Sequence, residues 1–430
     1  MKTEKKYKSR KELNKAKRIN AQLFPIYKMF SWDLLFFYAI QYLFFTITKG
    51  ISPGNLLKIN AFYPLFIILM QMPATICADF LGRKKSIVLG NALISLYVLI
   101  LIWAPNAFTI ILANIVYAFG YSLKAVQETN ILYDSTATKG GEGLYPKINA
   151  RGATGYYLLD GMASLIAGYL FVINGYLPMY ICLLFSIIST ILSIGFKDIY
   201  VNKLKDHQIS KRLKSYEKDL KYSIKNILKS KRLRALLIFM AIFNSALSIM
   251  GTYKGNILTE LKIDPETFSI INAALTFLAG IASNMQEKLH KRFKNKTLSV
   301  LALALTSSII AIGVLLHIET QYILPIILIL LSVESIVRSN YYILSERYIK
   351  NFSTPKSRSR ISFATEVFTN IVEATSLFIA GTLLDITNIT FSTLFVGLLL
   401  FLIFILVLDY MKTRFGLKPS EYRKQDIEFD

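Results

Sequence analysis

Long apolar segments without charged residues are the feature that most limits what this 430-residue chain can fold into. Several of them reach the roughly 20 residues that a helix needs to cross about 30 Å of hydrocarbon. A helix buried in a soluble protein seldom needs that length, and here it recurs along a chain that is 53% hydrophobic. The pattern predicts an all-α membrane protein.

The apolar segments fall into two sets of six. The first set is 29–47, 59–78, 86–104, 107–131, 152–173 and 177–196, and the second is 235–253, 268–285, 298–317, 322–345, 361–384 and 391–410. We therefore predict twelve transmembrane helices in two six-helix halves. The predicted parts are a basic N-terminal arm at 1–28, a first half at 29–196, a basic loop at 197–234, a second half at 235–411 and a tail at 412–430.

Positive charge is distributed unevenly over the predicted loops. The basic residues cluster in segments that would share one side of the membrane: the N-terminal arm, Arg83–Lys85, the loop 197–234, His290–Arg292, Arg347–Arg360 and the tail. The opposite loops contain Lys49, Lys254, Lys262 and little else that is positive. Basic loops stay in the cytoplasm, so we expect both termini inside and a cytoplasmic membrane, bacterial in type. The net charge of +23 is then explained by topology and by attraction to anionic lipids, not by a nucleic-acid partner.

Within the loop 197–234, apolar residues recur at three- and four-residue spacing. They are Leu213, Tyr216, Leu220, Ile224, Ile227 and Leu228. This spacing predicts an amphipathic helix on the membrane surface. A solvated linker with some helical bias is the alternative.

Neither a metal site nor an enzymatic constellation is evident in the sequence. Cys77 and Cys182 both fall inside apolar segments, and the three histidines are scattered. No phosphate-binding glycine loop is present, which argues against a nucleotide-driven pump. We expect no cofactor, no bound metal and no enzyme activity.

The polar, Lys-rich start without a small-residue cleavage site predicts a retained first helix instead of a signal peptide.

The turn after the second span reads Ala78-Asp79-Phe80-Leu81-Gly82-Arg83-Lys84-Lys85. Glycine permits a tight reversal, and the bases hold the turn in the cytoplasm. This turn resembles the signature loop between helices two and three of the major facilitator superfamily, with Asp79, Gly82, Arg83 and Lys84 matching and Thr75 in place of the first glycine. The fourth span ends in Glu128 and then Tyr133-Asp134-Ser135, which is similar to a bacterial branch often assigned to drug efflux. The resemblance implies the superfamily's two-half fold, alternating access and a gating role for the loop.

The two halves also resemble each other over a short stretch. Asp160-GMASLIAGYL in the fifth span aligns with Glu373-ATSLFIAGTL in the eleventh, acid on acid and Gly168 on Gly381. Internal repeats with a site between them are a recurring plan in transporters.

Ionisable residues inside membrane spans are costly and therefore candidates for function. Asp160 and Glu373 could exchange protons or be permanently protonated packing residues. Lys124 with Glu128, and Glu334 with Arg338, are four residues apart and so share a helix face; the resemblance places both pairs at a central cavity. Each pair is either a switch or a static bridge.

Three uncharged or peripheral polar groups complete the candidates. Gln41 and Asn244 could line a cavity or bridge helices. Asp33 is expected to cap the start of the first span.

Together these features predict a proton-coupled secondary transporter that works as a monomer and exports drugs or other small amphiphilic molecules. Uptake or export of a defined metabolite, such as a sugar or peptide, is the first alternative. A receptor or assembly factor that moves no solute is the second. Because the fifth span lacks the glycine-proline pattern of many exporters, the direction of transport is left open.

Overall fold

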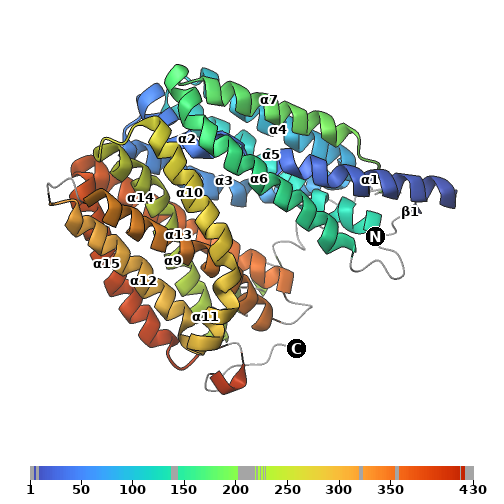
Figure 1. The fold of residues 1–430 in the computed structure, drawn as a ribbon. Helices are drawn as coiled ribbons and strands as arrows, with labels where there is room; N and C mark the ends of the chain where they lie inside the picture. The colour runs from blue at the N-terminus through green and yellow to red at the C-terminus, as the bar shows by residue number, and fades with distance from the viewer. Residues whose placement is uncertain are drawn as a thin grey trace. The chain divides into compact units, whose positions relative to one another are not determined.

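The computed structural model describes residues 4–5, 9–136, 144–201, 218, 221–222, 224–225, 227, 229–318, 323–353, 358–416 and 418–421. Nearly all of them are helical (Figure 1). Most of the surface helix predicted in 197–234 lies outside these residues. Of its six apolar positions only Ile224 and Ile227 are described, both in helical conformation.

Eleven long helices follow the predicted spans from the second onward. They are α3 (Pro53–Leu81), α4 (Arg83–Trp103), α5 (Ala107–Thr136), α6 (Leu144–Ile173), α7 (Leu177–Ile194), α9 (Lys231–Glu260), α10 (Pro265–Ala282), α12 (Thr297–Leu315), α13 (Ile323–Asn351), α14 (Arg358–Ile386) and α15 (Ile389–Met411). Among the described residues, ten ranges are long and apolar enough to cross a membrane. One of these ranges, Pro265–Leu315, contains both α10 and α12.

Short elements complete the described chain. They are β1 (Glu4–Lys5), β2 (Tyr200–Val201), α11 (Gln286–Phe293) and the 3-10 turns η2 (Ser283–Met285), η3 (Lys294–Lys296) and η4 (Pro419–Glu421). β1 pairs antiparallel with β2, with Glu4 opposite Val201.

The prediction of one continuous helix at 29–47 is wrong. The chain instead forms α1 (Arg10–Ser31), a non-helical stretch, α2 (Phe37–Leu43) and a π-helical turn, η1 (Phe44–Thr48). Phe36 adopts a φ of 67° at the break, which is unusual for a bulky side chain. Much of the predicted arm at 1–28 is therefore helical.

The apolar face of α1 explains why this helix escaped the hydropathy pattern. Its buried residues recur every three or four positions (Ala16, Asn20, Phe24, Tyr27 and Ser31), while lysines and arginines lie between them. A helix that is apolar on one side only does not produce a continuous apolar segment. The buried side belongs to a core with residues from α4, α5 and α6 and with Phe196.

The chain forms two compact units. Unit 1 comprises Met1–Ile51, Leu65–Ser210 and Asp264–Ala273, and unit 2 comprises Ser52–Pro64, Lys211–Ile263 and Ala274–Asp430. In unit 1, α4 packs along α5 and α7, and α1 contacts α5, α6 and α7.

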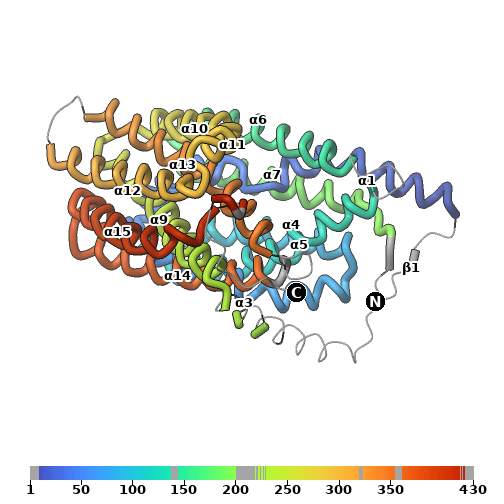
Figure 2. The backbone as a smooth tube through the Cα atoms, turned by 90° about the horizontal axis from the view of Figure 1, so that it is seen from below, coloured from blue at the N-terminus to red at the C-terminus, as the bar shows by residue number. Residues whose placement is uncertain are grey.

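In unit 2, α9 packs on α14 and α15, and α12 packs on α13 and α15. Figure 2 shows α12 running beside α15. Stacked aromatic rings fill the core of the unit, with Phe243 over Tyr341 at 4.0 Å between ring centroids.

Each unit includes the first turns of one helix whose remainder belongs to the other unit. The first turns of α3 are in unit 2, where Gly54 lies so close to α14 that an added Cβ would come within 2.6 Å of the Gly381 carbonyl. The first turns of α10 are in unit 1, where Ser269 Oγ accepts the Gly168 N–H at 3.0 Å. Gly168 and Gly381, aligned in the two repeats, thus both lie at close helix crossings.

Candidate functional site

Unit 2 contains an ion pair inside the helix bundle. Arg338 Nε donates to Glu334 Oε1 at 2.8 Å, and Arg338 Nη2 lies 2.6 Å from the same oxygen. The expected pair is therefore formed along α13. Arg338 Nη2 also donates to the Leu247 carbonyl of α9 at 2.8 Å. This guanidinium joins a carboxylate on its own helix to the main chain of another helix.

Glu373 reaches the same stretch of α9 from α14. Ser248 Oγ donates to Glu373 Oε1 at 2.5 Å. Leu247 and Ser248 are adjacent, so the Arg338 and Glu373 contacts lie side by side on α9. Contacts on α9 thereby bring two carboxylates, Glu334 and Glu373, and the Arg338 guanidinium together at one level of unit 2, along the axis of α9.

Lys254 adds a second cation to this group. The expectation that Lys254 lies in a loop is wrong, because α9 continues to Glu260. Lys254 is partly buried and within electrostatic range of Glu334 and Arg338. The hydropathy pattern could not find it, since a single lysine at the end of an apolar block is read as the boundary of the span.

The two amide candidates occupy different units. Asn244 lies on α9 one turn before Ser248, and its buried Oδ1 has no hydrogen-bond partner among the described residues. Gln41 is half-buried on α2 of unit 1. The structure does not bring these two residues into one described cluster.

Unit 1 has its own charged group, centred on Lys124 of α5. Lys124 Nζ donates to the Ser31 carbonyl at the end of α1 and lies 3.4 Å from Asn91 Oδ1. It is 3.8 Å from Glu128 Oε1, a looser pair than Glu334–Arg338. Glu128 accepts a hydrogen bond from the Tyr27 hydroxyl. A cation near a helix C-terminus stabilises the unsatisfied carbonyls there.

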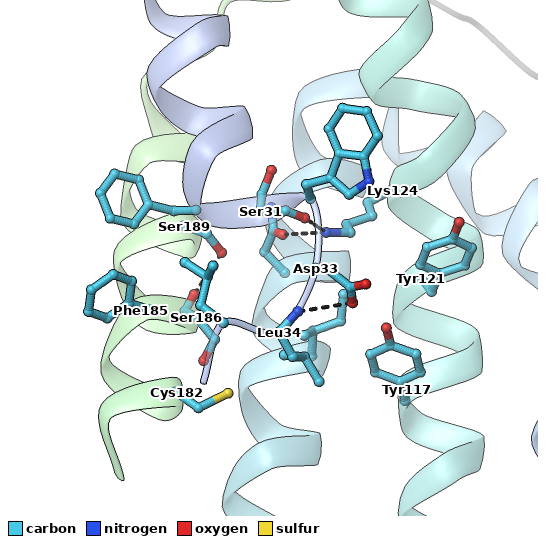
Figure 3. A pocket seen from close by; sticks show the side chains of 15 residues that line it. Ser31, Asp33, Leu34, Tyr117, Tyr121, Lys124, Cys182, Phe185, Ser186 and Ser189 are labelled. Atoms are coloured by element: carbon cyan, nitrogen blue, oxygen red, sulfur yellow. Dashed lines mark hydrogen bonds between the residues drawn. The ribbon is translucent and has the colours of Figure 1, made fainter. Parts of the chain in front are cut away.

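The break between α1 and α2 carries Asp33, which was expected to cap a helix start. Asp33 instead lies in the non-helical stretch, where its carboxylate accepts the Leu34 N–H at 3.0 Å. It interacts electrostatically with Lys124 and with Asp160 of α6. Figure 3 shows the break between α5, which presents Tyr117 and Tyr121, and α7, which presents Ser186 and Ser189.

Aromatic rings border Asp160. Trp32, in the break, stacks on Tyr156 with 5.7 Å between ring centroids and lies 5.9 Å from Tyr157. These two tyrosines precede Asp160 by one helical turn and share its face of α6. Lys28 Nζ is 4.0 Å from the centroid of the Trp32 ring on the same side.

The charges of the two groups balance differently. In unit 2, two cations (Lys254 and Arg338) accompany two carboxylates (Glu334 and Glu373). In unit 1, two cations accompany three carboxylates: Lys28, Lys124, Asp33, Glu128 and Asp160. The unit 1 group therefore carries one uncompensated negative charge when all its members are ionised.

The predicted signature turn joins α3 to α4. Gly82 has a φ of 79°, so glycine is required there for a conformational reason. Arg83 forms an ion pair with Asp134 at the end of α5 and donates to the Asn130 carbonyl at 3.1 Å. The Lys84 N–H donates to Asp198 Oδ1 at 2.8 Å. Asp79 lies half-buried in the last turn of α3.

Residues 28–259, more than half of the chain, match the family described as Major Facilitator Superfamily. The chain belongs to the major facilitator superfamily. No curated protein matches it. Membership in this superfamily indicates a multi-pass membrane transporter and not an enzyme.

Solved structures of superfamily transporters share the fold. The nucleoside transporter NupG superposes with a TM-score of 0.68 at 13% identity, covering 93% of this chain and 99% of that one. A POT family transporter in complex with a thioalcohol-conjugated peptide gives 0.65 at 14% identity, covering 94% and 96%. A bacterial homologue of the human lysosomal transporter Spinster, inward-facing and unoccupied, gives 0.63 at 12%, covering 98% and 99%. At these identities the likeness concerns the fold alone.

Proposed function

We propose that this chain is a proton-coupled secondary transporter that alternates access between its two halves and exports a small amphiphilic molecule. The observation that carries this proposal is the group at one level of unit 2, where Arg338 bonds both Glu334 and the Leu247 carbonyl while Glu373 bonds Ser248. Protonating either carboxylate changes which partner Arg338 prefers, and Arg338 holds two helices. Proton binding would thereby act on helix packing.

A buried carboxylic acid is well suited to this role. Low-dielectric surroundings penalise the charged form of any carboxylate, and a neighbouring guanidinium favours it. A small displacement of Arg338 between Glu334 and Glu373 would therefore exchange the proton affinities of the two groups. A static bridge, the alternative reading, would have no need for the second carboxylate.

The amphiphilic character of the substrate is inferred from unit 1. Tyr157 and Trp32 are exposed in the described structure beside Asp160. A carboxylate facing lipid would be costly, so we infer that this face of α6 meets water and substrate. Aromatic rings next to a carboxylate suit a molecule with an apolar body and a polar or cationic group.

A specific polar metabolite is the second candidate, and Lys254 favours it. Together with Arg338 it gives unit 2 two cations, which would suit a substrate with a carboxylate or phosphate. Proteins with a similar fold include a nucleoside transporter and a POT family transporter in complex with a thioalcohol-conjugated peptide. Those substrates indicate what the fold can accommodate.

Transport assays with purified protein in proteoliposomes test the proposal. An imposed proton gradient should drive accumulation of at least one compound from a panel of amphiphiles, nucleosides and peptides, and a protonophore should abolish it. Accumulation that survives the protonophore would contradict proton coupling. If no compound on a broad panel moves, a receptor or assembly factor on the same fold would be favoured instead.

A further inference from the structure

Positive charge is concentrated where the start of α9 meets the end of α15 in unit 2. Residues 229–234 and 409–421 together contain seven basic residues and two acidic ones. Arg234 Nε donates to the Tyr410 hydroxyl at 2.8 Å, so the two helix ends are in contact. We propose that these helix ends form a binding site for the headgroup of one anionic phospholipid.

Two guanidinium groups flank the Tyr410 ring. Arg414 Cζ lies 4.2 Å from the ring centroid, and Arg234 Cζ lies 6.0 Å from it. Arg414 Nη1 also donates to the Tyr410 carbonyl, which caps the C-terminal end of α15. This cap uses one of the five N–H donors of the guanidinium, whose planar fork matches the oxygens of a phosphate. The site therefore has the charge and the donors that a phosphodiester requires.

Arg414 lacks a counter-charge in the described part of the chain. Its side chain is partly buried, and its buried Nε has no hydrogen-bond partner among the described residues. Of the two nearby carboxylates, Glu421 lies 3.6 Å from His290 Nε2 of α11, and Asp409 is exposed and forms no ion pair with a described residue. Charges that are withdrawn from water are normally paired. An anionic ligand would supply the missing negative charge.

The position of the site favours a lipid as the source of this anion. α15 is strongly apolar, and its Leu402 and Leu406 are 60% and 72% exposed. The basic residues Lys412 and Arg414 follow these leucines directly at the end of the span, and Tyr410 lies between them, as is typical of a membrane interface. Acyl chains can thus lie along the leucines while the phosphate meets the guanidinium groups. Basic residues next to a span attract anionic lipids.

Native mass spectrometry of the full chain in a nonionic detergent tests the proposal. The protein is titrated with phosphatidylglycerol in competition with phosphatidylcholine that has the same acyl chains, at fixed ionic strength. We expect one phosphatidylglycerol to be retained in preference to phosphatidylcholine. This assay needs neither a gradient nor a transported substrate, so its result does not depend on the proposed transport.

Variants of basic residues separate a specific site from general attraction. Arg414→Gln should weaken the retention of phosphatidylglycerol by about tenfold, the equivalent of one charge-assisted contact. Arg414→Lys keeps the charge but not the fork and should recover part of the loss. Lys291→Gln is the matched control, because it removes one exposed positive charge from α11 of the same unit. Its affinity should equal that of the parent protein.

Variants of exposed carboxylates keep the test independent of the helix cap. Asp409→Asn removes a negative charge beside Tyr410 and should tighten the binding of phosphatidylglycerol by about fivefold, as expected for one charge at the membrane surface. Glu287→Gln makes the same change of charge at an exposed position of α11. It should leave the affinity unchanged.

Three results would overturn the proposal. The first is equal retention of phosphatidylglycerol and phosphatidylcholine. The second is an equal effect of the paired variants, Arg414→Gln with Lys291→Gln or Asp409→Asn with Glu287→Gln, which would indicate general attraction by net charge. The third is displacement of phosphatidylglycerol by inorganic phosphate at constant ionic strength, which would assign the site to a soluble anion.

Discussion

Arg338 and Lys124 each contact both a carboxylate and a main-chain carbonyl of another helix. Arg338 bonds Glu334 and the Leu247 carbonyl, and Lys124 lies near Glu128 and bonds the Ser31 carbonyl. A change of charge at either carboxylate therefore alters an attachment between helices. This coupling of charge to packing is the physical requirement for an ion-driven change of conformation.

Glu334→Gln should abolish gradient-driven transport while the protein remains folded. The amide keeps the shape of the side chain and can accept from Arg338, but it cannot gain or lose a proton in the working range. Exchange of substrate across the membrane without a gradient should persist. Proteoliposome uptake with and without an imposed gradient measures both activities.

Glu346→Gln is the matched control for that variant. Glu346 lies on the same helix and pairs with Lys350 at 2.6 Å, but both side chains are more than half exposed. Exposed pairs contribute little, so transport should be unaffected. Wild-type gradient-driven rates in Glu334→Gln would remove Glu334 from the mechanism.

Lys124→Met should lower the stability of unit 1. The methionine fills a similar volume but leaves the buried Ser31 carbonyl without its donor, at a cost of about 1–3 kcal/mol. The thermal unfolding temperature in detergent should fall accordingly. Lys124→Arg, which retains a donor, should recover part of the loss; a Met variant as stable as the parent would show that Lys124 does not hold the break.

Whole helices are positioned by two glycines that occupy equivalent places in α6 and α14. Gly168 contacts the first turns of α10, and Gly381 contacts those of α3. Both partner helices begin at a proline, Pro265 and Pro53, whose fixed φ suits the first helical position. Each repeat thus forms the same kind of helix crossing, α6 with α10 and α14 with α3.

Gly168→Ala should separate α6 from α10. A Cβ at Gly168 would lie 2.2 Å from Ser269 Oγ and 2.3 Å from the Pro265 carbonyl, so one of the helices must move. We expect a destabilisation of about 1–3 kcal/mol, as for other overpacked sites, measured by thermal unfolding. Gly161→Ala, on the same helix with open space around it, should be neutral or slightly stabilising. Equal changes of stability in Gly168→Ala and Gly161→Ala would contradict a close crossing of α6 and α10 at Gly168.

The start of α10 should show a pH-dependent contribution to stability. Asp264 accepts hydrogen bonds from the backbone N–H and the hydroxyl of Thr267, and these bonds lower the pKa of this exposed carboxyl. Because the folded pKa lies below the unfolded value of about 3.9, the contribution is complete above that value and is lost as pH falls through the folded pKa. The wild type should therefore unfold at a higher temperature than Asp264→Asn near pH 5, and the difference should shrink as the pH falls below the unfolded pKa and vanish once it is below the folded pKa. A difference in unfolding temperature that grew as the pH fell would contradict the expected direction of this pH dependence.

At the scale of the whole molecule, hydropathy predicted the helices that consist of long apolar segments. It failed for α1, which is buried on one side only. All predicted spans from the second onward overlap a helix, and the Glu334–Arg338 pair follows from the helical period. The break at Phe36 could not be predicted, because no glycine or proline marks it. Ser248 was not among the candidates and Lys254 was expected in a loop, because the role of both residues arises from contacts between helices distant in sequence, which periodicity does not encode.

The interrupted first helix also bears on topology. α2 and η1 together cover Phe37–Thr48, roughly 18 Å at 1.5 Å per residue, too short for about 30 Å of hydrocarbon. Crossing the membrane therefore requires the last turns of α1, where Phe24 and Tyr27 are buried. If these turns insert, the chain crosses twelve times with both termini inside. If they do not, the first crossing is lost and every later loop changes sides.

Labelling of single cysteines in intact cells distinguishes these topologies. With Cys77 and Cys182 replaced by serine, a membrane-impermeant maleimide should label Pro105→Cys and Ile318→Cys from outside, since both positions are exposed between helices. Lys85→Cys and Lys291→Cys, also exposed, should be labelled only after the membrane is permeabilised. The reverse pattern at all four positions would place the basic turns outside. With the N-terminus inside, it would also exclude crossing by α1, because one lost span inverts the entire remainder of the chain.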